Sequence, residues 1–166
     1  MILTNNNKKE NEMLLNLNND IYKIMVGLNK NEYFKKLLVN TDFRLQGNKE
    51  NENLLSIDLI GKAISRIPLI PKNETSSCII TTNKIIKEEN SHSAYIQLSI
   101  DIVTPLNQWE VVGGIRPLLL CNCLINFMED FNQTNGIKYR LFNITPITLN
   151  EVLSGYRLTY HTIIDK

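Results

Sequence analysis

The chain has 166 residues, enough for one domain with a hydrophobic core of ordinary size. Its 18 Lys and Arg residues nearly balance 17 Asp and Glu residues, and the formal net charge of +1 excludes a strong overall field toward nucleic acid, an anionic membrane or an acidic ligand. The 22 Ile and 23 Asn residues, beside only 7% aromatic residues, predict an aliphatic core and an amide-rich surface.

The first element predicted along the chain is an amphipathic helix. Apolar residues recur there at intervals of three and four positions, with Asn, Asp and Lys between them. They are Leu14, Leu17, Ile21, Ile24 and Leu28. Because an α-helix has 3.6 residues per turn, this spacing gives the helix one narrow apolar stripe.

A second helix is predicted in the segment "NEYFKKLLVN", residues 31–40. Asn31 is a candidate N-cap, because an Asn side chain can accept a hydrogen bond from the first helical turn. The apolar face is expected to hold Tyr33, Phe34, Leu37 and Leu38. Lys35 and Lys36 are assigned to the solvated side of this helix.

A third helix is predicted in "LLSIDLIGKAISRIP", residues 54–68, after a polar loop. Helical spacing relates its apolar residues Ile57, Ile60, Ile64 and Ile67. Pro68 is expected to end the helix, because the residue before a proline disfavours the helical region. Residues 1–70 are thus predicted to be mainly helical.

The period changes from about residue 77, where two strands are predicted. The segment "SCIITTNKIIK", residues 77–87, is short and β-branched, and "SAYIQLSIDIVTP", residues 93–105, alternates apolar and polar residues. One face of the second strand is expected to carry Ile96, Leu98, Ile100 and Ile102, and the other Gln97, Ser99 and Asp101. The loop between the two strands suits a hairpin.

A helix over residues 117–131 is the most apolar element predicted. Gly113 and Gly114 end the strand region before it, and Pro117 stands where proline favours a first helical turn. Its polar residues form one seam: Asn122, Asn126, Glu129, Asp130 and Gln133. A single small sheet covers only one side of such a helix. Either the N-terminal helices or a neighbouring subunit must therefore cover the rest, and both can hold.

Two notable residues, Arg116 and Trp109, precede this helix in the sequence. A cation at a helix N-terminus opposes the helix dipole, so Arg116 is expected to be held by an acid, either within the chain or across an interface. Trp109, the single Trp of the chain, is expected to anchor the connecting loop in the core.

Two closing strands complete the predicted fold, "IKYRLFNITPI" at residues 137–147 and "SGYRLTYHTII" at residues 154–164. The order predicts an α+β protein, in which N-terminal helices precede a mostly antiparallel sheet of about four strands. The core, residues 77–166, has the order β-β-α-β-β, with the 117–131 helix packed on one face. A single domain over residues 1–166 is expected.

Candidate reactive groups give no catalytic site. Cys121 and Cys123 lie two residues apart on a helix and so point about 200° apart, which prevents them from sharing a metal ion. With Cys78 they make an odd number of cysteines, so no disulfide framework and a reducing compartment are expected. The two histidines, His92 and His161, have no ligand at metal-binding spacing.

The remaining catalytic options are weak for reasons of spacing. Ser154-Gly155 begins a strand without the Gly-x-Ser-x-Gly of a hydrolase elbow, and Gly113-Gly114 lacks the rest of a nucleotide motif. Asp101, Glu110 and Glu129 are the nearest candidates for a metal-dependent hydrolase. We predict no enzyme, no cofactor and no metal. The absence of a signal-like leader and of a membrane-length apolar run predicts a soluble protein made in the cytoplasm.

The C-terminal half resembles neck and tail-completion proteins of tailed bacteriophages. The resemblance rests on an ordered set of segments over about residues 77–164: "LSIDIVTPLNQWEVVGGIRP", the helix after it, "GIKYRLFNITPI" and "SGYRLTYHTII". The segments "NEYFKKLLVNTDFRLQ" and "ISRIP" extend it more faintly. The amide-rich composition further suggests a crAss-like phage.

The resemblance implies a virion protein that forms a homo-oligomeric ring in the neck between portal or head and tail. Such rings continue the DNA channel, contact neighbouring portal, neck and tail proteins, and have no catalytic residues. The residues carried over by position as interface or architectural residues are Trp109, Arg116, Pro117, Gly155 and Tyr156. Candidate contacts with DNA in the channel are Lys84, Lys87 and Lys138. The alternative is a phage factor that binds or processes nucleic acid.

Overall fold

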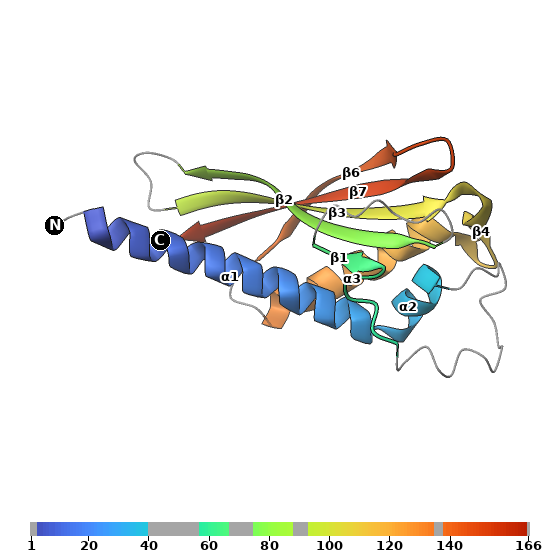
Figure 1. Ribbon diagram of the computed structural model, residues 1–166, viewed down its shortest axis with the longest axis horizontal. Coiled ribbons are helices and arrows are strands. Elements are labelled where there is room, and N and C mark those ends of the chain that lie inside the picture. The colour runs from blue at the N-terminus through green and yellow to red at the C-terminus, as the bar shows by residue number, and fades with distance from the viewer. Residues whose placement is uncertain (1–2, 40–56, 67–74, 88–92, 135–137, 166) are drawn as a thin grey trace.

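Three helices lie on one side of a long, twisted sheet in the computed structural model, which describes residues 3–39, 57–66, 75–87, 93–134 and 138–165 (Figure 1). The helices are α1 (Leu3–Lys30), α2 (Glu32–Val39) and α3 (Arg116–Thr134). The strands of the sheet are β1 (Ile64–Ser65), β2 (Ser77–Lys87), β3 (Ser93–Pro105), β6 (Arg140–Thr148) and β7 (Leu153–Asp165). The predicted α+β fold, with N-terminal helices before the sheet, is confirmed.

The five strands are arranged in the order β1-β2-β3-β7-β6. β1 pairs in parallel with β2, and the other neighbours are antiparallel. A short 3-10 turn (Leu106–Gln108) and a small hairpin of β4 (Glu110–Val111) and β5 (Gly114–Ile115) connect β3 to α3. The four long strands therefore have the predicted β-β-α-β-β order, while β1 and the small hairpin were not predicted.

The core lies between the three helices and the face of the sheet that looks toward them, here called the inner face. The four predicted apolar residues of β3, Ile96, Leu98, Ile100 and Ile102, are all fully buried in it. The alternate residues of β3 point to the opposite, outer face. There Asp101 lies opposite Arg157 of β7 and accepts two hydrogen bonds from its guanidinium, at 2.7 and 2.8 Å.

Helix α1 keeps most of the predicted apolar stripe. Leu17, Ile21, Ile24 and Leu28 are buried, but Leu14 is 47% exposed and Met13 is buried in its place. Met13 lies four residues before Leu17 and Leu14 only three, and the stripe follows the four-residue spacing at this end of the helix.

Helix α2 is capped as predicted, because the backbone N–H of Phe34 donates to Oδ1 of Asn31 at 3.0 Å. Its other assignments need correction. Tyr33 is 48% exposed, and Lys35, assigned to the solvated side, is buried, with Nζ donating to the backbone oxygen of Ile57. The carbonyl accepts one hydrogen bond from the ammonium group, while the aliphatic stem lies in the core. The partner is 22 positions away in the sequence, so helical spacing gives no sign of it.

The helix predicted over residues 54–68 is wrong within the described residues 57–66. Gly61 has φ +77°, a conformation outside the right-handed helix, and the chain turns there so that Ile64 and Ser65 pair with Cys78 and Ile79. The side chain of Asn29 holds the turn from α1, since its Oδ1 accepts from the backbone N–H of Leu59 at 2.9 Å. Ile67 and Pro68 lie outside the described residues.

Tyr139 ties the start of β6 to two helices. Its hydroxyl donates to Oδ2 of Asp20 in α1 at 3.1 Å, and its backbone N and O bond to the side chain of Asn132 in α3 at 2.8 and 2.7 Å. Burial and the Asp20 charge raise the pKa of Tyr139, which keeps the hydroxyl protonated as a donor. These hydrogen bonds therefore fix the start of β6 relative to α1 and α3.

Replacing Tyr139 by Phe is expected to lower the free energy of unfolding by about 1–3 kcal/mol, because Asp20 then loses a buried donor. Urea unfolding of the wild type and Tyr139→Phe measures the loss. Tyr33→Phe is the matched control, since the exposed ring should change stability by no more than about 0.5 kcal/mol. Equal stability of Tyr139→Phe and the wild type would show that the bond contributes nothing.

Candidate functional site

Arg116 is held inside the subunit. It is the first residue of α3, its side chain is fully buried, and Nη1 donates to the backbone oxygen of Leu37 at 3.1 Å. Leu37 lies in the last turn of α2, where carbonyls carry the negative end of the helix dipole. The guanidinium thus lies at the unfavourable end of its own helix and at the favourable end of α2. An acid was expected to hold Arg116; the partner found at Nη1 is a carbonyl of the same chain.

The N-terminal helices also provide the cover that α3 was expected to need. α1 and α2 both pack against α3, and Gly27 of α1 lies so close that a Cβ there would overlap the ring of Phe127. The predicted polar seam of α3 is exposed along its length. Of the two predicted sources of cover, the one within the chain is present.

Trp109 anchors the connection between β3 and α3. Its Nε1 donates to the backbone oxygen of Thr104 at 3.2 Å, and its ring lies 6.2 Å from that of Tyr156 with a 33° tilt. The backbone oxygen of Trp109 accepts from the N–H of Arg116 at 2.7 Å. Trp109, Arg116 and Tyr156 are therefore brought together at one end of the molecule, with Trp109 half-buried.

Gly155 lies next to Tyr156 in β7, opposite Val103 of β3 and Ile147 of β6. A Cβ at this position would overlap the backbone oxygen of Ile102. The two strands approach so closely that only Gly fits. Since Gly155, Arg116 and Pro117 are buried, these three residues serve the interior of the subunit.

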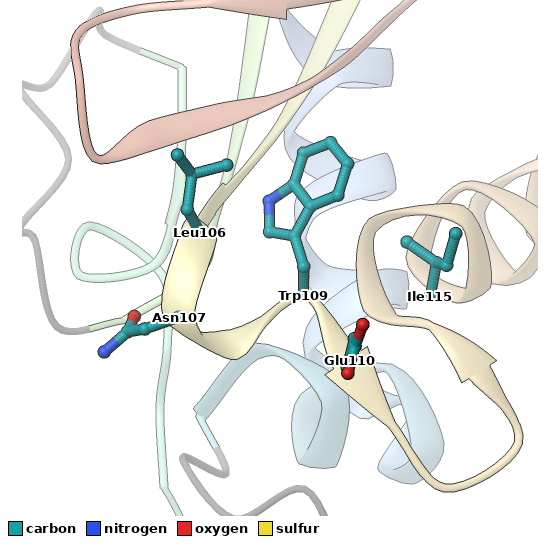
Figure 2. A pocket seen from close by; sticks show the side chains of 5 residues that line it. All are labelled: Leu106, Asn107, Trp109, Glu110 and Ile115. Carbon is teal, nitrogen blue, oxygen red and sulfur yellow. The ribbon is translucent and has the colours of Figure 1, made fainter.

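Exposed aliphatic residues and two acids gather at the end of the molecule around Trp109. A depression of about 330 Å³ there is lined by Leu106, Asn107, Trp109, Glu110 and Ile115 (Figure 2). The β6–β7 turn joins it, because the backbone oxygen of Val152 accepts from the N–H of Leu106 at 2.9 Å. We call this surface the acidic end patch and define it by Leu106, Glu110, Ile115, Leu149, Glu151 and Val152, which are all exposed.

A second surface, with basic character, lies toward the other end of β3. A depression of about 470 Å³ is lined by Tyr95, Lys138, Arg140, His161, Thr162 and Ile163. Phe142 stacks on His161 with ring centroids 4.3 Å apart, and Tyr95 meets the same imidazole edge-on at 4.8 Å. Phe142 and Ile163 are 66% and 68% exposed. We call this surface the basic end patch and define it by Tyr95, Lys138, Arg140, Phe142, His161 and Ile163.

The sheet register builds the basic end patch from segments far apart in sequence. Gln97, His161 and Arg140 are opposite one another on β3, β7 and β6. Arg140 and Phe142 were not among the site residues predicted from the sequence. The sequence did contain a sign of this surface. Arg140 and Phe142 are two positions apart in one of the predicted C-terminal strands, and His161 and Ile163 are two positions apart in the other. Residues at this spacing share one face of a strand, so the spacing places large or charged residues together on the face that does not join the core.

The three candidate DNA-contact lysines do not form one cluster. Lys138 belongs to the basic end patch, whereas Lys84 is exposed on β2, separated from β6 by β3 and β7. The side chain of Lys87 lies outside the described residues.

The groups considered for catalysis are occupied or dispersed. Asp101 is paired with Arg157, Glu110 lies in the acidic end patch, and Glu129 is exposed on α3. In the described part of the chain, no three His, Cys, Asp or Glu side chains form a group that could hold a metal. The helices described there include none long and apolar enough to cross a membrane. His92 lies outside the described residues.

The cysteines are buried to different depths. Cys78 and Cys121 lie in the core, and Cys123 is half-buried. Burial raises the pKa of Cys121 to about 12 and raises that of Cys78 further. Both thiols are therefore kept neutral and unreactive in the folded protein.

These shifts predict a loss of stability at alkaline pH. In the unfolded chain the thiols ionise near 9.0 and the phenols of Tyr139 and Tyr160 near 10.0, while in the fold burial holds all of them protonated. Above about pH 9 the unfolded state binds fewer protons, so the free energy of unfolding should fall by up to about 1.4 kcal/mol per pH unit and group. Urea unfolding between about pH 8 and about pH 11 measures this fall. Cys121→Ala should reduce it, and constant stability across the range would contradict it.

A comparison with protein families gives a match that spans most of the fold. The family model YomW matches residues 31–162, about four fifths of the chain. The matched segment runs from the cap of α2 to near the end of β7, and it contains the whole acidic end patch and all of the basic end patch except Ile163. No curated protein matches the chain.

Proposed function

Because the chain belongs to the YomW family, which is phage-associated, we propose that it is a structural virion protein forming a homo-oligomeric ring in the phage neck. The ring lies between portal or head and tail and continues the DNA channel. Its partners are copies of itself and the neighbouring portal, neck and tail proteins. The resemblance of residues 77–164 to neck and tail-completion proteins supports this proposal.

The observation that carries it is the pair of exposed patches at opposite ends of the sheet. Exposed apolar clusters with a polar rim mark interaction sites on soluble proteins. Tyr95 and Pro105 are ten positions apart on β3, so the ends are separated by roughly 33 Å at about 3.3 Å per residue. A subunit with a different interaction surface at each end makes heterologous, head-to-tail contacts. Such contacts form a closed ring when the rotation that relates each subunit to the next divides a full turn evenly.

The test is the presence and mass of the protein in the particle. Peptide mass spectrometry of purified virions should find the chain in several copies per particle, and native mass measurement of the neck should find it in a multimer. A protein absent from the virion contradicts the proposal. The isolated chain can be monomeric without contradicting it, since some ring subunits assemble only on a partner.

Contact with DNA inside the channel is part of the same proposal. The candidate residues remain Lys84, Lys87 and Lys138, of which Lys84 and Lys138 are exposed. Such contacts would be made to phosphates and would carry no sequence specificity.

The second candidate function is a phage factor that binds or processes nucleic acid. The basic end patch favours it, because Lys138 and Arg140 beside the stacked Phe142 and His161 combine cations with exposed aromatic faces. Binding of a fluorescent single-stranded oligonucleotide should then weaken with salt, with a slope set by the number of phosphates contacted. The absence of measurable affinity at low salt removes this candidate.

A further inference from the structure

The two end patches carry opposite charge. In the segments that build the acidic end patch, residues 105–115 and 148–153, the charged residues are Glu110 and Glu151, and both are exposed. In residues 138–142 and 159–163, which build most of the basic end patch, they are Lys138 and Arg140, beside the imidazole of His161. Each patch is therefore complementary to the other and repels a copy of itself.

Both patches also offer apolar area to bury. Phe142 and Ile163 lie beside the cations, and Leu106, Ile115, Leu149 and Val152 lie beside the carboxylates. An apolar centre surrounded by charged groups is the composition of a specific protein contact, in which charge selects the partner and buried area provides affinity.

Strand pairing between subunits is disfavoured by the edges of the sheet. β6 forms one edge, and it contains Pro146 and a register shift between Leu141 and Asn143. β2, which is covered by β1 only at Cys78 and Ile79, has a similar shift between Thr82 and Lys84. Proline, bulges and Lys on an edge interrupt the row of free backbone groups that another strand would need. Contact between copies must then use side chains.

We propose that the basic end patch of one copy docks on the acidic end patch of the next, head to tail. The inference rests on the proposed ring and names the two surfaces that form it. Arg140 and Lys138 face Glu110 and Glu151 across the contact, with Phe142 and Ile163 against the aliphatic residues of the neighbour. In this arrangement Lys138 serves the contact between copies, which leaves Lys84 and Lys87 as the candidates for contact with DNA. Because the patches lie at opposite ends of the sheet, each subunit binds two neighbours at once.

Charge reversal tests this contact directly. One variant replaces Lys138 and Arg140 by Glu, and a second replaces Glu110 and Glu151 by Lys. Each variant alone has two ends of like charge, so its self-association in sedimentation velocity should be about tenfold weaker than that of the wild type. An equimolar mixture should recover association, because every contact in an alternating assembly again joins opposite charges.

The control is an equal charge change elsewhere. Lys30→Glu with Lys62→Glu alters two exposed lysines outside both patches, and this variant should associate like the wild type.

Wild-type association should weaken as the salt concentration rises, since the charged pairs between the patches are exposed. Either reversed variant associating normally, or a mixture no better than its components, overturns the proposed contact while leaving the ring itself standing. Loss of oligonucleotide binding in the first variant without loss of association also overturns it and supports the nucleic-acid function.

If the isolated wild type remains monomeric, the same variants are scored by incorporation into particles. Each variant alone should then be lost from virions and the two expressed together should be retained; retention of either one alone overturns the contact. Absence of the wild type itself from virions instead overturns the proposed function.

Discussion

Replacing Gly155 by Ala is expected to destabilise the protein by more than about 3 kcal/mol, beyond the usual cost of overpacking a core. The added Cβ would overlap the backbone oxygen of Ile102 in the neighbouring strand. A flexible side chain could rotate away, but a backbone carbonyl in a paired strand cannot. Relief therefore requires β3 and β7 to separate where β7 is paired on both sides. Urea unfolding, or the soluble yield if the variant does not fold, measures the effect.

Gly61→Ala separates steric overlap from backbone strain in this experiment. Gly61 has φ +77°, and a Cβ there meets nothing within 4 Å. That variant should lose only about 1 kcal/mol, the cost of placing a non-Gly residue in the left-handed region. Equal losses for Gly155→Ala and Gly61→Ala would contradict the close approach of β3 and β7.

Arg116→Ala is expected to lower the free energy of unfolding by about 3 kcal/mol, because a buried, charged donor and its packing are lost together. The carbonyl of Leu37 then loses its Arg116 donor at the end of α2. Since that partner lies in the same chain, folding should fail before assembly does. Chemical unfolding and sedimentation of the same samples measure both properties.

Arg140→Ala is the matched control for Arg116→Ala. Arg140 is exposed in the basic end patch, so its removal should leave unfolding within about 0.5 kcal/mol of the wild type and weaken association. Normal stability of Arg116→Ala combined with failed assembly would reverse the assignment and place the essential partner of Arg116 in another subunit.

Periodicity predicted the elements that bury one regular face. The alternation of Ile96, Leu98, Ile100 and Ile102 predicted β3 and its inner face. The polar seam after Pro117 predicted α3. Asn31 could be identified as a cap because its hydrogen bond spans only three residues. The apolar patterns follow from the geometry of each element, because a helix has 3.6 residues per turn and a strand alternates its faces every two residues.

Long-range contacts account for what periodicity missed. The isoleucines around Gly61 have helical spacing, yet pairing of Ile64 with Cys78 draws the segment into the sheet. The Leu37 carbonyl that accepts from Nη1 of Arg116 is 79 positions away, and a backbone acceptor leaves no mark in a sequence. The basic end patch likewise exists only once the register of three strands brings residues 95, 140 and 161 together.

An image of the virion neck that resolves side chains tests the central claim most directly. The proposal predicts a closed ring of this α+β fold around the channel, with Lys138 and Arg140 of each copy facing Glu110 and Glu151 of the next. A neck whose rings are built entirely from other chains would contradict it.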